Sequence, residues 1–150
     1  QGVEQDDKEA FKWYQKAADQ GVASAQYNLG SMYGRGQGVE QDFKEAVKWW
    51  KKAADQGYAD AQYSLGVMYR DGQGVEQDDK EAFKWYQKAF QILLQEALKN
   101  NAEAQHRVGL MYTEGEGVKQ SIASGKRWLK KAAAQGHKKA KRALQELENK

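Results

Sequence analysis

The stretch Asp42–Tyr69 reads DFKEAVKWWKKAADQGYADAQYSLGVMY and contains two helical segments separated by a glycine. In the first segment, Val47, Trp50 and Ala54 follow one another at the spacing of a single helix face. The same apolar spacing continues over Ala59–Tyr69, where we expect a second helix. Neither segment alternates as a strand would, so the stretch predicts a helical pair.

Polar residues mark the start of the first helix of each pair. Asp42 is followed three residues later by Glu45, the spacing of a capping box, and the same pattern predicts helix starts at Asp6 and Asp78. Ser121 takes this place in the last unit. The expected helix ends are residues that tolerate a left-handed conformation, namely Gly21, Gly57, Asn100 and Gly136.

Glycine also stands inside the second helix, at Gly66. A glycine there costs about 1 kcal/mol relative to alanine, so we attribute it to close approach of two helices. The connector GRGQGVEQD (34–42) is glycine-rich as well. It follows a helix instead of a strand and lacks the GxxxxGK[ST] pattern, which favours a structural turn over a phosphate-binding loop.

The helical pair is repeated along the chain. The tryptophans Trp13, Trp49, Trp85 and Trp128 are separated by 36, 36 and 43 residues, and four Gly-Val pairs show the same spacings. The stretch 1–17 reappears unchanged at 73–89. One helical pair cannot bury its apolar face alone, so repeats must stack, and we expect the repeated tryptophans to pack between helices.

The residues AQYNLGSMY (25–33) and KEAVKW (44–49) carry a family resemblance. They are part of a pattern, A-x-x-A-Q-Y-x-L-G-x-M-Y…G-x-G-V-x-Q-D-x-K-E-A-x-K-W, that resembles the Sel-one-like repeat (SLR) family, which is related to tetratricopeptide repeats. The resemblance covers nearly the whole chain. It implies an all-α fold, a right-handed α-solenoid of antiparallel helix pairs with about eight helices, used in the family as a protein–protein adaptor.

The 43-residue spacing is the one departure from the repeat. Seven additional residues fall between Ala89 and Ala97. Seven residues add two helical turns and rotate the following side chains by only about 20°. The insertion therefore predicts one long helix, Asp79–Lys99. This helix matches the repeat in two registers, which predicts a single solenoid (1–150) made of sub-arrays 1–89 and 86–150 that share the helix.

Apolar side chains gather in the second register of this helix. Leu94 and Leu98 stand where Lys51 and Asp55 stand in the preceding repeat. Two interpretations remain open for them: packing across the junction between arrays, or an exposed patch for a partner or a second copy of the chain. The candidate junction or oligomer patch is Phe90, Ile92, Leu94 and Leu98.

Composition narrows the functional classes. The 150 residues contain no Cys, so disulfides and thiolate metal sites are excluded, and no Pro, which suits uninterrupted helices. No run is apolar enough to span a bilayer and no targeting segment is evident, so we expect a soluble protein without membrane association, of undetermined compartment. Residues 101–150 carry 11 basic and 5 acidic side chains. Such an excess spread over helices is a weak nucleic-acid signal, and we expect no nucleic-acid partner.

Nothing in the sequence assembles a catalytic site. Only two histidines occur, and no metal-ligand pattern surrounds them. His106 takes the position of Tyr27 and Tyr63, which favours a surface or groove role. The basic cluster His137–Arg142 begins the last helix, and we interpret that helix as a polar terminal cap of the solenoid. We therefore expect neither catalysis nor a cofactor or metal.

A binding groove is the remaining candidate site. By analogy with tetratricopeptide layout, three rows of side chains would line a concave face: Ser24, Tyr27, Asn28 and Ser31; Asp60, Tyr63, Ser64 and Val67; Glu103, His106, Arg107 and Leu110.

The sequence thus favours a non-catalytic repeat scaffold. Nearly identical repeats and a helix that fits two registers indicate an engineered fusion of two arrays; a natural adaptor that binds peptide or protein segments in its groove is the alternative. We expect a monomer, with a homo-oligomer through Leu94 and Leu98 as the other possibility.

Overall fold

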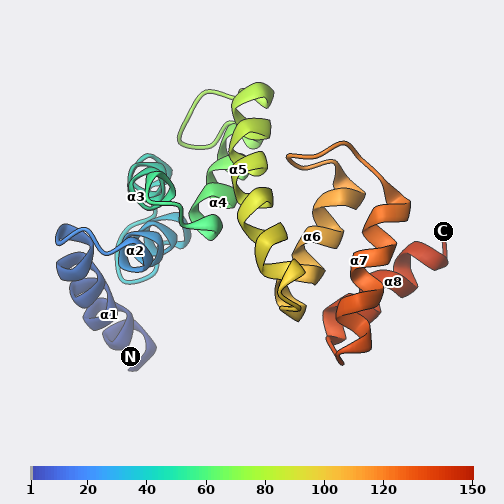
Figure 1. The fold of residues 1–150 in the computed structure, drawn as a ribbon. Helices are drawn as coiled ribbons and strands as arrows, with labels where there is room; N and C mark the ends of the chain where they lie inside the picture. The colour runs from blue at the N-terminus through green and yellow to red at the C-terminus, as the bar shows by residue number, and fades with distance from the viewer. Residues whose placement is uncertain (1) are drawn as a thin grey trace. The chain divides into compact units, whose positions relative to one another are not determined.

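A computed structural model describes residues 2–150 of the chain, which form helices joined by short connectors (Figure 1). Over these residues there are eight helices and no strand: α1 (Gly2–Asp19), α2 (Ala23–Arg35), α3 (Phe43–Asp55), α4 (Ala59–Asp71), α5 (Asp79–Leu98), α6 (Ala102–Glu114), α7 (Ile122–Ala134) and α8 (Lys138–Glu148). The prediction of an all-α chain built from helix pairs is confirmed. None of the described helices is long and apolar enough to cross a membrane.

The described chain divides into two compact units, and the boundary falls inside α5, between Trp85 and Tyr86. In the first unit α2 packs against both α1 and α3, and α3 packs against α4. In the second unit α7 packs against both α6 and α8. Helix α5 has 20 residues, whereas α3 has 13. It ends one residue before the predicted Lys99.

Three helix starts follow the predicted caps. The Asp42 carboxylate accepts hydrogen bonds from the backbone N–H groups of Lys44 and Glu45, at 3.0 and 3.2 Å. Asp78 binds the first turn of α5 in the same way, and the Ser121 hydroxyl accepts from Ser124 at the start of α7. These oxygens satisfy N–H groups that have no partner within the helix.

The predicted start at Asp6 is wrong. Helix α1 begins at Gly2, so Asp6 lies inside the helix and caps nothing. In the other repeats a preceding helix ends at a left-handed glycine such as Gly36, and the Gln41 side chain donates to the Gly34 carbonyl across the connector. Residues 2–5 have no such helix before them within this chain, and they continue the helix instead.

The connectors are structural turns, as predicted. Gly74, with a φ of 72°, sits on the first residue of α3: a Cβ added there would lie 2.5 Å from the carbonyl oxygen of Phe43. No side chain has room at that position, and the left-handed φ also favours glycine. Helix ends at Gly21, Gly57 and Gly136 have positive φ, and Asn100 is the only described non-glycine residue that does.

Helix pairs approach closely where glycine stands in the second helix. A Cβ at Gly30 would lie 2.7 Å from Cδ1 of Trp50, and one at Gly109 would lie 2.8 Å from Cγ of Leu129. The Trp50 indole N–H donates to the Tyr27 carbonyl at 3.1 Å, so this large side chain is buried without an unpaired donor. The close approach proposed for Gly66 is therefore seen at its repeat equivalents.

The repeated tryptophans do not share one environment. Trp49 and Trp85 are buried, whereas Trp13 is 66% exposed and Trp128 is half-buried. The expectation that all four pack between helices is wrong for Trp13. Trp49 packs on Ala18, Ala25 and Leu29 of the preceding helix pair, and no preceding pair exists for Trp13 within this chain.

Helix α8 is amphipathic. Ala140 is fully buried against α7, and Leu144 and Leu147 are partly buried against the same cluster. Its basic side chains Lys138, Lys139, Lys141 and Arg142 are exposed. The helix therefore turns one apolar face to α7 and one basic face to solvent.

Candidate functional site

The first unit contains an open hollow between α2, α3 and α4, with a volume of about 310 Å³. That volume lies at the lower end of the range typical of ligand pockets. The lining residues are Tyr27, Ser31, Gly34, Arg35, Phe43, Trp50, Tyr63, Ser64, Val67 and Met68. The wall is mostly aromatic and aliphatic, and Arg35 supplies its only charge.

Some of the residues predicted to line a groove do line this hollow. Tyr27, Ser31, Tyr63, Ser64 and Val67 line it, so two of the three predicted rows contribute. The other members of these rows, Ser24, Asn28 and Asp60, do not. Phe43 and Trp50 of α3 were not predicted, because the groove was placed on the second helix of each pair alone. Arg35, the last residue of α2, was also not among the predicted residues.

Two tyrosines meet beside the hollow. The Tyr27 and Tyr58 rings have centroids 5.3 Å apart and planes tilted by 37°. Burial, and then the negative charge of Asp60, raise the pKa of the Tyr58 phenol above its usual value. The phenol therefore stays neutral at ordinary pH and can donate a hydrogen bond.

The third predicted row lies in the second unit. Of the surface or groove role expected for His106, the surface part is wrong, and the groove part stays a prediction. His106 is only 8% exposed. Leu110 is partly buried against the Leu129 cluster, whereas Glu103 is exposed and Arg107 half-buried. The burial of His106 arises because a second histidine, 31 residues later, covers its ring.

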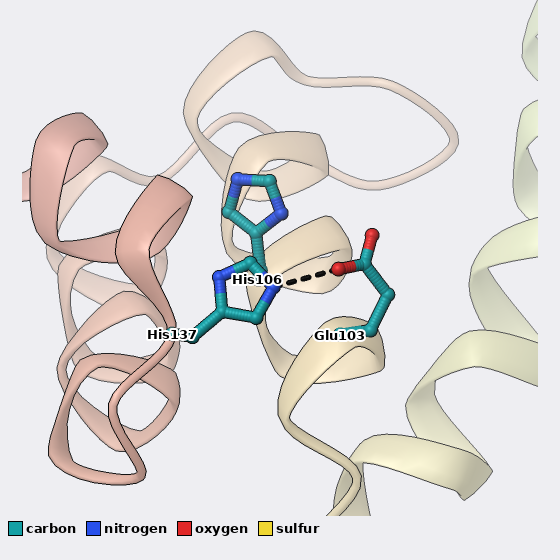
Figure 2. A group of neighbouring side chains, drawn as sticks. All are labelled: Glu103, His106 and His137. Carbon is teal, nitrogen blue, oxygen red and sulfur yellow. Dashed lines mark hydrogen bonds and ion pairs between the residues drawn. The ribbon is translucent and has the colours of Figure 1, made fainter.

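The covering residue is His137, and the two imidazoles stack with centroids 4.7 Å apart and planes 30° from parallel. His137 Nε2 lies 2.6 Å from Oε2 of Glu103, as Figure 2 shows. Its other ring nitrogen, Nδ1, accepts the Ala140 backbone N–H at 3.1 Å and so caps α8. A neutral imidazole has one N–H, so this acceptor role assigns the proton to Nε2, which donates to Glu103.

Charge and burial shift the acid–base properties of this cluster. The hydrogen bond from His137 is the main cause that lowers the pKa of Glu103, so the carboxylate stays ionised. Burial lowers the pKa of His106, and the positive charge that His137 can carry acts in the same direction. Nδ1 of His106 is buried and has no hydrogen-bond partner among the described residues.

The predicted junction patch is divided. Phe90 is buried and meets the Tyr112 ring edge-on at 5.3 Å. Ile92 and Leu94 are half-buried, while Leu98 is 64% exposed. The exposed-patch interpretation therefore stays a prediction that rests chiefly on Leu98.

Hydrogen bonds between pairs of glutamine side chains occur in both units, and they were not predicted from the sequence. Gln26 donates to the Ala18 carbonyl at 3.2 Å, and its own oxygen accepts from Gln56 at 2.8 Å. Gln105 and Gln135 are paired in the same way in the second unit, at 2.9 Å. Recurrence of Gln at these two positions was the available signal, but nothing local in the sequence indicates that they meet.

Comparison with known proteins identifies the repeat. The Sel1 repeat family model matches residues 1–22, 23–58, 59–91 and 102–137. A Sel1 repeat protein from Oxalobacter formigenes is 41% identical with a TM-score of 0.65, over 91% of this chain and 53% of that protein. The protein c5321, a protective antigen of uropathogenic Escherichia coli strains with an SLR fold, is 40% identical with a TM-score of 0.60, over 84% and 26%.

A third structure shares the fold at lower identity. Helicobacter pylori cysteine rich protein B is 22% identical with a TM-score of 0.55, over 95% of this chain and 97% of that one. No curated protein matches the chain. The chain spans about half the length of the Oxalobacter protein and about a quarter of c5321. With four family-model matches over most of its length and a relative 41% identical, the chain belongs to the Sel1 repeat family.

Proposed function

We propose that this chain is a non-catalytic repeat scaffold that binds a protein or peptide segment in the hollow between α2, α3 and α4. The observation that carries the proposal is the aromatic and aliphatic wall of this hollow beside a single cation, Arg35. Sel1 repeat proteins generally mediate protein–protein interactions. On this chain, we expect that role to be carried out at the hollow.

The lining indicates what kind of segment would bind. Tyr27, Tyr63 and Val67 are half-buried, so each already offers apolar surface at the wall. The Ser31 hydroxyl already donates to the Tyr27 carbonyl at 3.1 Å, so a ligand need not accept a hydrogen bond from it. An apolar side chain would fill the hollow, and a carboxylate on the same segment would pair with Arg35.

A display selection of random peptides against the whole protein tests this proposal. The expected result is a set of binders that share an apolar anchor and a nearby acidic residue. Ser31→Trp fills the hollow from α2, and Tyr63→Ala removes part of its wall; each should weaken the selected peptides by at least about tenfold, since a buried aromatic anchor is worth about 2 kcal/mol or more.

Ser24→Trp is the matched control, because Ser24 is exposed on the same helix and does not line the hollow. Equal weakening by the Ser24 and Ser31 variants, with circular dichroism unchanged, would place binding elsewhere. A selection that returns only binders insensitive to Ser31→Trp and Tyr63→Ala would also contradict the proposal.

A second proposal concerns the long helix. We infer that α5 joins two repeat arrays, as an engineered fusion would, because it has 20 residues and the boundary between the compact units falls within it. A shared helix must complete both arrays. Fragments 1–98 and 79–150 should therefore each be helical and unfold cooperatively in thermal melts. A fragment 79–150 without a cooperative transition would contradict the shared helix.

A further inference from the structure

The histidine pair of the second unit occupies the place of a tyrosine pair in the first unit. Tyr27 and Tyr58 are 31 residues apart, and their tilted rings have centroids 5.3 Å apart; His106 and His137 are also 31 residues apart and stack at 4.7 Å. These equivalent positions therefore bring two aromatic rings together once in each unit, as tyrosines in the first and as histidines in the second. In the second unit both members carry nitrogen ligands.

A carboxylate completes the group. Glu103 stands in the repeat where Ser24 stands in the first unit, three residues before the first member of the pair. One ligand atom from each of Glu103, His106 and His137 lies within 4.8 Å of the other two. Figure 2 shows the carboxylate and both rings brought together from two segments of the unit, with the Glu103–His137 contact drawn.

His106 supplies an observation that ordinary packing does not explain. Its ring is more than nine-tenths buried, and Nδ1 makes no hydrogen bond among the described residues. A buried polar atom without a partner is costly in a folded protein. In Figure 2 the ring lies over the His137–Glu103 pair, so a ligand held by that pair would also come within reach of His106.

We propose that Glu103, His106 and His137 bind a divalent transition-metal ion of the Zn²⁺ type. Two imidazoles and one carboxylate are ligands that suit Zn²⁺ and its neighbours Co²⁺ and Ni²⁺. Ligand atoms around tetrahedral zinc lie about 3.4 Å apart, given metal–ligand distances near 2.0–2.1 Å. For binding, the Glu103–His137 pair at 2.6 Å must open, and the other ligand atoms, which all lie within 4.8 Å of one another, must move to that spacing by side-chain rotation.

The ion can reach these three residues from solvent, and a further coordination position is open on the solvent side. The side chain of Glu103 is 60% exposed, so the group opens to solvent on that side. Water would complete the coordination there. The single negative charge of the carboxylate offsets half of the charge of the ion, and the two imidazoles add ligands without adding charge.

Metal binding would change one hydrogen bond of the protein. An ion on Nε2 of His137 takes the place of the proton there, and in a neutral ring that proton then resides on Nδ1. Nδ1 could no longer accept the Ala140 N–H, so α8 would lose its cap. Ligating histidines normally donate their second N–H to an acceptor, and none is provided here; we expect binding about 10- to 100-fold weaker than at a site with that support.

Calorimetric titration of the untagged protein with Zn²⁺ tests the proposal. The chain has two histidines and no cysteine, so protein prepared without an affinity tag offers no other imidazole or thiolate that could compete for the ion. The expected result is one Zn²⁺ per chain, with Co²⁺ giving the visible spectrum of nitrogen–oxygen ligation. Faster hydrogen exchange at the Ala140 amide upon Zn²⁺ addition is the signature of the lost cap.

Two of the test variants use residues that the repeat already carries at equivalent positions. His106→Tyr restores the residue found at Tyr27 and Tyr63, and His137→Asn introduces the residue that caps α6, Asn101. Each should lower Zn²⁺ affinity by at least about tenfold, as should Glu103→Gln, because each removes one of three ligands. Glu146→Gln, an exposed glutamate on α8, should leave the affinity unchanged.

Three outcomes would overturn the site. The untagged protein would show no Zn²⁺ binding; or the variants would bind as the parent does, which means an adventitious ion only; or His106→Tyr would retain full affinity, which means that Glu103 and His137 bind the ion without the buried histidine. Melting curves of each variant without metal keep loss of binding separate from loss of fold. Peptide binding at the hollow of the first unit is measured independently of this result.

Discussion

At the scale of single residues, Gly30 decides how closely α2 and α3 can pack. A Cβ there would lie 2.7 Å from Cδ1 of Trp50, and 3.1 Å from the Ala46 carbonyl oxygen. Gly30→Ala must therefore separate the helices or displace the indole, even though alanine is the better helix former. We expect a loss of about 1–3 kcal/mol in the free energy of unfolding, measured by urea denaturation.

Gly2→Ala is the control for that substitution, because Gly2 also lies in a helix and a Cβ added there would have no neighbour within 4 Å. It should leave the free energy of unfolding unchanged or slightly raised. A Gly30→Ala variant as stable as the parent would show that the two helices separate at no cost.

The Tyr58 phenol should make the protein sensitive to alkali. Its pKa is raised in the folded state, first by burial and then by Asp60. The folded state thus keeps a proton that the unfolded state loses near the ordinary value of 10.0. This contribution to stability is complete below that pH and disappears as the pH rises through the higher folded pKa.

Tyr58→Phe removes the ionisation, so the decline in unfolding free energy between about pH 9 and pH 11 should be shallower than in the parent. Urea denaturation at several pH values measures both slopes. Identical slopes would mean that Tyr58 titrates alike in the folded and unfolded chain.

At the scale of the element, a cap acts only where a helix begins. Asp42 accepts two first-turn N–H groups of α3, whereas Asp6, at the same place in the repeat, lies inside α1. Asp42→Ala should cost about 1 kcal/mol of unfolding free energy, and Asp6→Ala only a small fraction of that. Denaturant titration of the two variants makes the comparison, and equal losses would mean that α1 starts near Asp6 after all.

This pair of residues also shows what could be predicted from the sequence. Caps, apolar spacing and helix-ending residues located α3, α4, α5 and α7 closely, and the length of α5 followed from counting turns. The start of α1 was missed because residues 2–5 continue that helix, whereas the same Asp-x-x-Glu pattern begins α3 and α5. The exposure of Trp13 was missed because its position is buried only by a neighbouring repeat.

The candidate sites show a second limit of sequence reasoning. Tyr27, Tyr63 and Val67 were placed in a groove by their helix positions, and they do line the hollow. The His106–His137 stack joins residues of different helices, and no local spacing reveals it. The separation of 31 residues that pairs these positions becomes visible in the sequence only after the Tyr27–Tyr58 pair has been seen.

At the scale of the whole molecule, we predict a monomer. Leu98 is the exposed apolar side chain of the junction patch, and Gln95 and Lys99 beside it are exposed polar residues. A specific interface needs about 1,000 Å² or more of buried surface, and one leucine supplies a small part of that. Light scattering on a sizing column should give the mass of one chain, 17.0 kDa.

Leu94→Lys/Leu98→Lys should leave that mass unchanged. A parent that elutes as a dimer, and a double variant that elutes as a monomer, would contradict the prediction and establish the homo-oligomer instead. A dimer that survives both substitutions would place the interface on another surface.

The contact between Gly74 and the first residue of α3 restricts where such a chain can gain or lose residues during evolution. A single residue inserted in the connector would bring a side chain to the place of Gly74, where a Cβ would lie only 2.5 Å from the Phe43 carbonyl oxygen. A deletion would pull the turn away from the helix on which it packs. A helix tolerates a change of two whole turns, as α5 illustrates. Changes in length that preserve the fold should therefore add or remove either a complete repeat or a nearly whole number of helical turns. Single-residue insertions in the connectors should be selected against.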